Sequence, residues 1–205
     1  MLSASEALAH LVEGNRRFAA DAPFAATRST AIRRQLAASQ APHAVILGCS
    51  DSRVPVEIVF DQGLGDLFVI RVAGNIIAPS LIGSVEFAAE RFGTRLIVIL
   101  GHSGCGAVQA TLEQLQQPAA TQSPNLAAIV DRIRPAVQGL LADGQRRDPA
   151  ALLSGAVRAN IRASAHQLRH GSRIIQHLID SAGLLVVGAE YSLETGLVDV
   201  FDGLP

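Results

Sequence analysis

The stretch AVILGCSDSRVP, residues 44–55, has a pattern that determines the fold, and LIVILGHSGCGAV, residues 96–108, has the same pattern. In each stretch an apolar run typical of a buried strand ends in a glycine, Gly48 or Gly101. Side chains that can bind a metal ion follow each glycine, which indicates two strands that deliver such groups to one place. They are Cys49 and Asp51 in the first stretch, and His102 and Cys105 in the second.

A shared metal site predicts the order of the strands. Zinc lies about 2.0–2.3 Å from its ligand atoms, so the groups that follow both strands must converge closely. Neighbouring strands of a sheet lie roughly 4.8 Å apart, and we therefore expect the strands at 43–48 and 96–100 to pair. The strand expected at 67–72 then lies outside the first one, which gives the local order 2-1-3.

Strands and helices alternate along the chain, which is typical of an α/β protein with a parallel sheet. We expect a single domain over residues 1–205, made of an N-terminal helical arm (1–40) and an α/β core (41–205). The central sheet should be mostly parallel, with local order 2-1-3-4, flanking helices and a C-terminal edge strand. The other expected strands are 184–187 and 196–201, and the expected helices are 3–20, 29–39, 79–92, 104–116, 125–142 and 148–182, with a helical turn at 54–61.

Composition narrows the function. The chain has 205 residues, of which 49% are hydrophobic, enough for one globular core. Its apolar runs, about five residues long, are too short to cross a membrane, and a net charge of −1 gives no electrostatic case for nucleic acid or a membrane surface. Two cysteines at this length argue against a disulfide scaffold. The first residues lack the order of a secretion signal, so we expect a cytoplasmic protein.

The candidate ligands together suit zinc, because thiolate, imidazole and carboxylate are its usual partners. A structural zinc site more often uses four Cys or His ligands in paired loops. Here one candidate is the carboxylate of Asp51, and Arg53 stands two residues away. A guanidinium can accept that carboxylate in a bidentate pair. Transfer of Asp51 to Arg53 would open a coordination position for water, which catalysis at zinc needs.

The motifs CSDSRV (49–54) and GHSGCGAV (101–108) resemble those of the β-class carbonic anhydrases. Within that class, this bacterial-type chain is most similar to the plant-like branch. Three further stretches match the same family: EGNRRF (13–18), FDQGLGDLFVIRVAGN (60–75) and GSVEFA (83–88). The resemblance covers most of the chain, and the paired motifs at this separation are highly specific to the family.

The resemblance implies one zinc ion per chain, held by Cys49, His102 and Cys105. Asp51 is then either the fourth ligand or, turned away, the partner of Arg53. The implied reaction is the reversible hydration of carbon dioxide to bicarbonate and a proton, with zinc-bound hydroxide as the nucleophile.

The resemblance also implies a substrate pocket shared between two subunits. It therefore implies a homodimer, with pairing of dimers into a tetramer as the alternative. The family's glutamine, which the neighbouring subunit supplies, falls at Gln40, and its phenylalanine falls at Phe68. Its valine and tyrosine fall at Ala73 and Phe87, two departures that keep the slot for carbon dioxide apolar. Gly106 completes the set of expected substrate-binding residues.

Some bacterial relatives, by the same resemblance, hold an idle form of the site by binding bicarbonate in a separate pocket. That pocket uses a tryptophan, a tyrosine and an arginine. Here the first two positions are Ile46 and Gly188, and Arg71 matches the arginine. We therefore expect that bicarbonate does not lock this site shut.

Other interpretations remain open at this point. The same zinc site would also suit hydrolysis of COS or CS₂, which relatives of the family perform. A nucleotide-binding module is a further alternative, because GHSGCG (101–106) is rich in glycine, although its order differs from the dinucleotide fingerprint. Three histidines on one predicted helix, His166, His170 and His177, are interpreted as a solvated helix surface.

Overall fold

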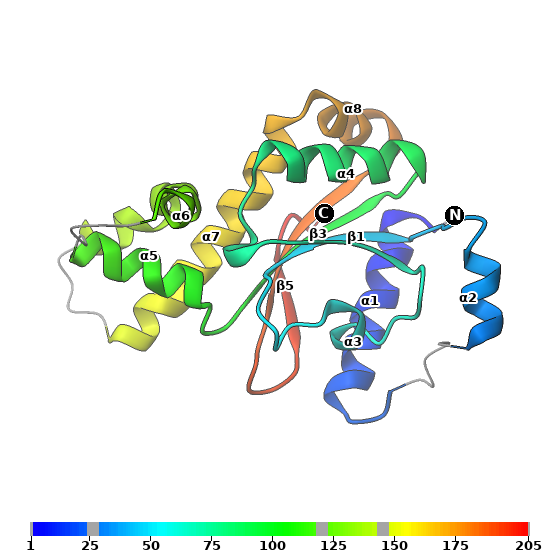
Figure 1. Ribbon diagram of the computed structural model, residues 1–205, viewed down its shortest axis with the longest axis horizontal. Helices are drawn as coiled ribbons and strands as arrows, with labels where there is room; N and C mark the ends of the chain where they lie inside the picture. The colour runs from blue at the N-terminus through cyan, green and yellow to red at the C-terminus, as the bar shows by residue number, and fades with distance from the viewer. Residues whose placement is uncertain (1, 24–28, 118–122, 143–147, 205) are drawn as a thin grey trace.

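One sheet organises the part of the chain that the structure, a computed structural model, describes: residues 2–23, 29–117, 123–142 and 148–204. Its five strands have the order β2-β1-β3-β4-β5 (Figure 1). The pairs among β1 to β4 are parallel, and β5 runs antiparallel to β4 at one edge. The predicted local order 2-1-3-4 and the C-terminal edge strand are confirmed. The strands are β1 (Ala44–Gly48), β2 (Leu67–Arg71), β3 (Leu96–His102), β4 (Leu185–Tyr191) and β5 (Val198–Asp202).

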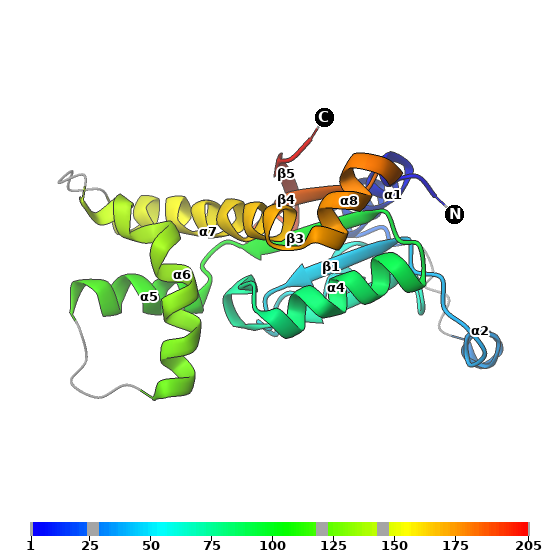
Figure 2. The same ribbon diagram turned by 90° about the horizontal axis from the view of Figure 1, so that it is seen from above.

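Helices cover both faces of this sheet. Helices α4, α7 and α8 lie on one face, and α1 and α3 lie on the other (Figures 1 and 2). β1 and β3 are buried along their whole length, as their continuous apolar runs require. None of the helices described is both long and apolar enough to span a bilayer. The helices are α1 (Ala4–Ala19), α2 (Thr30–Leu36), α3 (Val56–Val59), the 3₁₀ helix η1 (Ala73–Asn75), α4 (Pro79–Arg91), α5 (Gly106–Gln116), α6 (Pro124–Ala142), α7 (Pro149–Gly171) and α8 (Arg173–Ala182).

Parallel pairing brings the two sequence motifs to one edge of the sheet. Gly48 pairs with Leu100 in register, so the chain leaves β1 and β3 at nearly the same height. Cys49 follows β1 directly, and His102 is the last residue of β3. This edge, where parallel strands have their carboxyl ends, is where open α/β sheets bind ligands.

Helix α1 begins at the capping box that Ser3 was predicted to open. Toward the end of the helix, the buried side chain of Asn15 ties it to the core. Its Nδ2 donates to the carbonyls of Val59 and Gly196, at 3.1 and 2.8 Å. Its Oδ1 accepts from the N–H of Val198 at 2.8 Å. Asn15 thus joins the first helix to the start of the last strand.

The prediction of one helical stretch over 148–182 is wrong, because the chain breaks between α7 and α8 at Ser172. Ser172 is non-helical (φ −129°, ψ 121°), and its hydroxyl accepts from the N–H of Ile175 as the N-cap of α8. The same hydroxyl donates to Oε1 of Glu86 on α4 at 2.6 Å. The apolar periodicity continues through the break, so only this long-range contact reveals it.

Strand β4 is longer than the predicted 184–187, since it continues through Gly188 to Tyr191. A glycine usually weakens the interior of a strand, so it suggested the strand's end. Here a Cβ at position 188 would lie 2.9 Å from Cγ2 of Ile161 and 3.1 Å from Cβ of Asp202. Gly188 is therefore required by the close approach of α7 and β5 rather than by a turn.

Candidate metal centre

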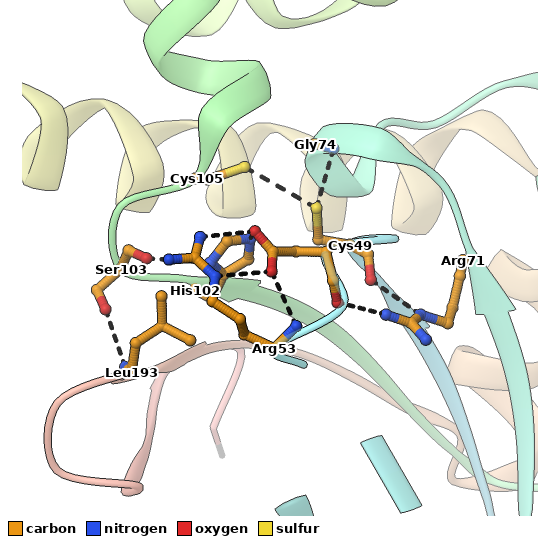
Figure 3. A network of polar contacts seen from close by, with 9 residues as sticks. Cys49, Arg53, Arg71, Gly74, His102, Ser103, Cys105 and Leu193 are labelled. Atoms are coloured by element: carbon orange, nitrogen blue, oxygen red, sulfur yellow. Dashed lines mark hydrogen bonds and ion pairs between the residues drawn. The ribbon is translucent and has the colours of Figure 1, made fainter. Parts of the chain in front are cut away.

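Three side chains meet at the carboxyl edge of the sheet: Cys49, His102 and Cys105 (Figure 3). Their ligand atoms all lie within 4.8 Å of one another, and all three residues are buried. The two strands deliver Cys49 and His102, while Cys105 is the N-cap residue of α5. The predicted convergence of these three groups is confirmed.

The imidazole of His102 is fully buried and has one bonded nitrogen. Nδ1 lies 3.0 Å from the carbonyl oxygen of Ser103, and a carbonyl can only accept, so Nδ1 donates. The Ser103 hydroxyl in turn accepts from the N–H of Leu193 at 3.0 Å. This tautomer leaves the lone pair on Nε2, which has no hydrogen-bond partner among the described residues. A buried nitrogen in this state fits a metal ligand.

The two thiols are close enough to share a proton, since their Sγ atoms lie 4.0 Å apart. The hydrogen bond from Cys105 lowers the pKa of Cys49 to about 4, and the N–H of Gly74, 3.4 Å from Sγ, adds to this effect. The same bond with Cys49, together with burial, raises the pKa of Cys105. A divalent cation would replace the shared proton and take both sulfurs as thiolates.

Asp51 lies beside the cluster and is paired with Arg53. The guanidinium donates to both carboxylate oxygens, Nε at 2.9 Å and Nη2 at 2.7 Å. This bidentate pair holds the pKa of Asp51 well below its usual range. Oδ2 still lies 3.8 Å from Nε2 of His102, so the carboxylate faces the ligand atoms. Of the two expected positions of Asp51, the structure has the one on Arg53.

Arg71 of β2 supports the loop that carries these groups. Its Nε donates to the carbonyl of Cys49 at 3.0 Å, and its Nη2 donates to the carbonyl of Asp51 at 2.6 Å (Figure 3). Two donors of this guanidinium are therefore taken by the loop's own backbone. Neither Ile46 in β1 nor Gly188 in β4 has an aromatic side chain.

The expected pocket residues fall into two groups, and the first group adjoins the ligands. Ala73 opens η1, whose next residue, Gly74, contacts Sγ of Cys49. Gly106 follows Cys105 as the first residue of α5. Ala73 is thus one residue away from the N–H that contacts Cys49, and Gly106 is one residue away from the ligand Cys105.

The second group consists of Gln40 before β1, Phe68 in β2 and Phe87 on α4. Gln40 precedes β1 whereas Cys49 follows it, and five strand residues span about 16 Å. Gln40 lines a surface hollow together with Phe92. The Phe92 ring lies 6.0 Å from that of Phe68 and 5.5 Å from that of Phe87, and Phe87 is 54% exposed. Gln40 therefore lies about a strand length from the ligands of its own chain and beside Phe92, which belongs to an aromatic cluster of which only Phe87 is exposed.

Sequence reasoning missed Gly74 and Ser103, which contact ligand side chains, and Asn160, whose Nδ2 donates to the carbonyl of Gly74 at 2.8 Å. Gly74 has a left-handed backbone (φ 71°), for which a glycine soon after a strand is a weak signal. Asn160 is polar between the apolar positions Val157 and Ile161 of a long helix, and all three are buried. A polar residue on an apolar helix face was the only available sign of its contact.

Comparisons with known proteins agree with this site. Residues 44–198 match the family described as "Carbonic anhydrase". "Carbonic anhydrase 2" of Mycobacterium tuberculosis is 40% identical over 186 residues, which cover 91% of this chain and 87% of the relative. The Coccomyxa β-carbonic anhydrase in complex with acetazolamide superposes with a TM-score of 0.75 at 25% identity, over 96% of this chain and 88% of that one. Two tetrameric β-carbonic anhydrases of Sordaria macrospora share the fold, with a TM-score of 0.72 at 23% identity over 96% of this chain and 97% of theirs.

The donor set also fits the metal of that family. Two thiolates and a neutral imidazole are preferred zinc ligands, and three protein ligands leave a position open for water or substrate. Cys49, His102 and Cys105 hold one zinc ion per chain in this way. Because the family match spans residues 44–198 and includes all three ligands, this chain belongs to the β class of the carbonic anhydrases.

Proposed function

We propose that this carbonic anhydrase hydrates carbon dioxide with Asp51 and Arg53 as its catalytic pair. The observation that carries this proposal is the placement of Asp51: its carboxylate faces the ligand cluster, yet Arg53 holds it in a bidentate pair. The reaction is the reversible hydration of carbon dioxide to bicarbonate and a proton.

When bound, zinc lowers the pKa of a coordinated water toward neutrality and so supplies a nucleophile at neutral pH. The chain's own groups orient the reaction. Asp51 stays ionised because Arg53 depresses its pKa, so its oxygens can only accept hydrogen bonds. We propose that Oδ2 accepts a hydrogen bond from the attacking water and directs its lone pair toward carbon dioxide. Ala73 and Gly106 would border the substrate on the chain's own side.

Elemental analysis and a carbon dioxide hydration assay on one preparation test this proposal. We expect one zinc ion per chain and an activity that disappears on treatment with a strong chelator and returns with zinc. A zinc-loaded protein without activity would contradict the proposed roles. The same assay with COS or CS₂ in place of carbon dioxide tests the alternative substrates.

We also propose that two chains share each active site, with Gln40, Phe68 and Phe87 reaching the metal of the partner subunit. Gln40 lies a strand length away from its own ligands. The exposed Phe87 of α4 lies beside Phe68 of the edge strand β2, with 6.3 Å between ring centroids. An exposed apolar ring near a strand whose outer edge has no partner among the described residues supports contact with a second subunit. The tetramers of Sordaria macrospora support pairing of such dimers.

A mixture of two impaired variants tests the shared site. Gln40→Ala should lower activity roughly tenfold because it removes one hydrogen bond to substrate, while its zinc stays bound. Cys105→Ser should have no zinc. In a mixed dimer, the Gln40→Ala chain keeps its zinc and receives Gln40 from its partner. We therefore expect about a quarter of the wild-type activity after random exchange of subunits.

Formation of the mixed dimers is checked by native mass spectrometry. The control is Gln116→Ala, at an exposed position of α5, which should have full activity on its own. Mixed dimers whose activity does not exceed the sum of the two variants would show that Gln40 does not act across subunits.

The surroundings of Arg71 predict the response to bicarbonate, and the Asp51–Arg53 pair predicts the state of the site at higher pH. Two donors of Arg71 bind backbone carbonyls, and no aromatic residue occupies position 46 or 188. We therefore expect inhibition by bicarbonate to be hyperbolic, with a Hill coefficient of about 1. Crystals grown near about pH 8 should have Asp51 on Arg53 in every subunit, because hydroxide, which zinc makes available from near-neutral pH upward, then competes with the carboxylate for the metal. Cooperative inhibition, or Asp51 on the metal, would refute this.

We place the enzyme in the cytoplasm. Its two cysteines are both unpaired and both serve as metal ligands, and a reducing compartment keeps thiols available for that role. Fractionation of cells that produce the tagged protein would test this location.

A further inference from the structure

A short turn connects the thiol of Cys49 to the helices behind the metal centre. This turn is η1, and the N–H of its Gly74 donates to Cys49 Sγ at 3.4 Å. Gly74 (φ 71°) and Asn75 (φ 42°) both have a left-handed backbone. Glycine adopts this conformation readily, but asparagine does so at a cost. Two such residues in succession need support from outside the turn.

Asn160 of α7 supplies that support. Its Nδ2 donates to the carbonyl of Gly74 at 2.8 Å, and the side chain is only 2% exposed. A buried amide costs free energy unless it is hydrogen-bonded. On a helix whose neighbouring buried positions are mostly apolar, this polar residue therefore serves the contact with the turn.

The same part of α7 also contacts the strand that ends in His102. Ile161 packs on Gly101, where a Cβ would lie 2.5 Å from Cδ1 of Ile161. Helix α7 is thus seated directly on β3, one residue before a ligand. Asn160 extends from this fixed point to the turn beside the other strand's ligand, Cys49.

We propose that Asn160 is a positioning residue for the metal centre, which aims the Gly74 N–H at Cys49 Sγ. An N–H donor directed at a thiolate disperses its negative charge and fixes its orientation toward the metal. The proposal rests on the zinc site described above. It assigns a role in metal binding to Asn160, a residue of α7 that is not itself a ligand.

Asn160→Leu tests the proposal because it keeps the branching and the number of side-chain heavy atoms and removes the donor. We expect zinc affinity, measured by competition with a chromophoric chelator, to fall by roughly 10- to 100-fold. In the cobalt-substituted protein, the thiolate-to-cobalt charge-transfer band should change in energy or intensity, because the orientation and charge of Cys49 Sγ change. Neither readout depends on catalysis.

Asn15→Leu is the matched control. Asn15 is equally buried, at 2%, and also donates to backbone carbonyls, but these belong to Val59 and Gly196, neither of which bonds a ligand side chain. Its loss should lower thermal stability while zinc affinity stays within about twofold and the cobalt band is unchanged. Equal loss of zinc affinity in both variants would overturn the proposal, as would a folded Asn160→Leu protein that matches the wild type. A wild-type chain that binds no zinc would instead overturn the metal centre itself.

Asn160→Asp is the second variant, because it has the same shape and replaces the donor by an acceptor. It should show the same two changes as Asn160→Leu, and it decides the question if the leucine variant does not fold. If neither variant folds while Asn15→Leu does, Asn160 is a residue of the fold alone and the proposal fails.

Discussion

The Cys105→Ser protein should contain less than about a tenth of a zinc ion per chain and lose at least about a thousandfold of its carbon dioxide hydration. A serine hydroxyl is a far weaker acid than a thiol, so the site loses one of its two anionic ligands. Cys105 is 1% exposed, which leaves little room for a solvent ligand to replace the sulfur. Elemental analysis after dialysis and stopped-flow kinetics measure the two losses.

A pair of histidine variants separates loss of the ligand from loss of a buried polar group. His102 and His43 both have an Nε2 without a hydrogen-bond partner among the described residues. Only His102 belongs to the ligand cluster. His102→Asn should therefore lose zinc as Cys105→Ser does, whereas His43→Asn should keep it. Full zinc content in the Cys105→Ser protein would refute the assignment of ligands.

The Asp51→Ala protein should keep one zinc ion per chain and still lose about a hundredfold or more of its activity. The carboxylate faces the ligand atoms, 3.8 Å from Nε2 of His102, but it is bonded to Arg53 and is not needed to hold the metal. Its removal takes away the acceptor that orients the attacking water. The loss should appear in kcat, measured by stopped flow, with zinc content measured on the same sample.

Asp131→Ala is the control for breaking an aspartate–arginine pair. Asp131 and Arg134 form an ion pair of 3.1 Å on α6, outside the metal centre. Exposed pairs of this kind contribute little to stability, so this variant should keep both zinc and activity. If Asp51→Ala lost its zinc, Asp51 would be a ligand rather than a catalytic group, and an unchanged kcat would show that it has no part in the reaction.

The sheet could be predicted because the metal motif and the strand pattern impose the same constraint. Cys49 and His102 can meet only if β1 and β3 are neighbours, and this condition sets the order 2-1-3 before any pairing is known. The unbroken apolar runs of both strands add that both faces are covered. The order of these strands could therefore be predicted from short motifs in the sequence.

The breaks within elements could not be predicted, because contacts distant in the sequence cause them. Ser172 ends α7 and caps α8, while its hydroxyl donates to Glu86 on another helix. Gly188 continues β4 because Ile161 and Asp202 approach it closely. In both cases the local signal, a hydrophobic period or a glycine, pointed the other way.

In the metal centre, too, some residues could be predicted from the sequence and others could not. The ligands Cys49, His102 and Cys105 are visible in the sequence because metal chemistry restricts the residue types and their spacing. The groups around them act through the backbone: Gly74 contacts Cys49 Sγ through its N–H, and Asn160, the proposed positioning residue, bonds the carbonyl of Gly74. Such contacts depend on the path of the backbone, which spacing alone does not give.

The position of Gln40, one strand length from the ligands of its own chain, has a consequence for dilute enzyme. In the proposed dimer a complete catalytic centre exists only while two chains are associated. Specific activity would then follow an association isotherm, although every chain keeps its zinc. The abundance of the protein would set both the quantity of enzyme and the fraction that is competent, so that expression level controls turnover without any effector.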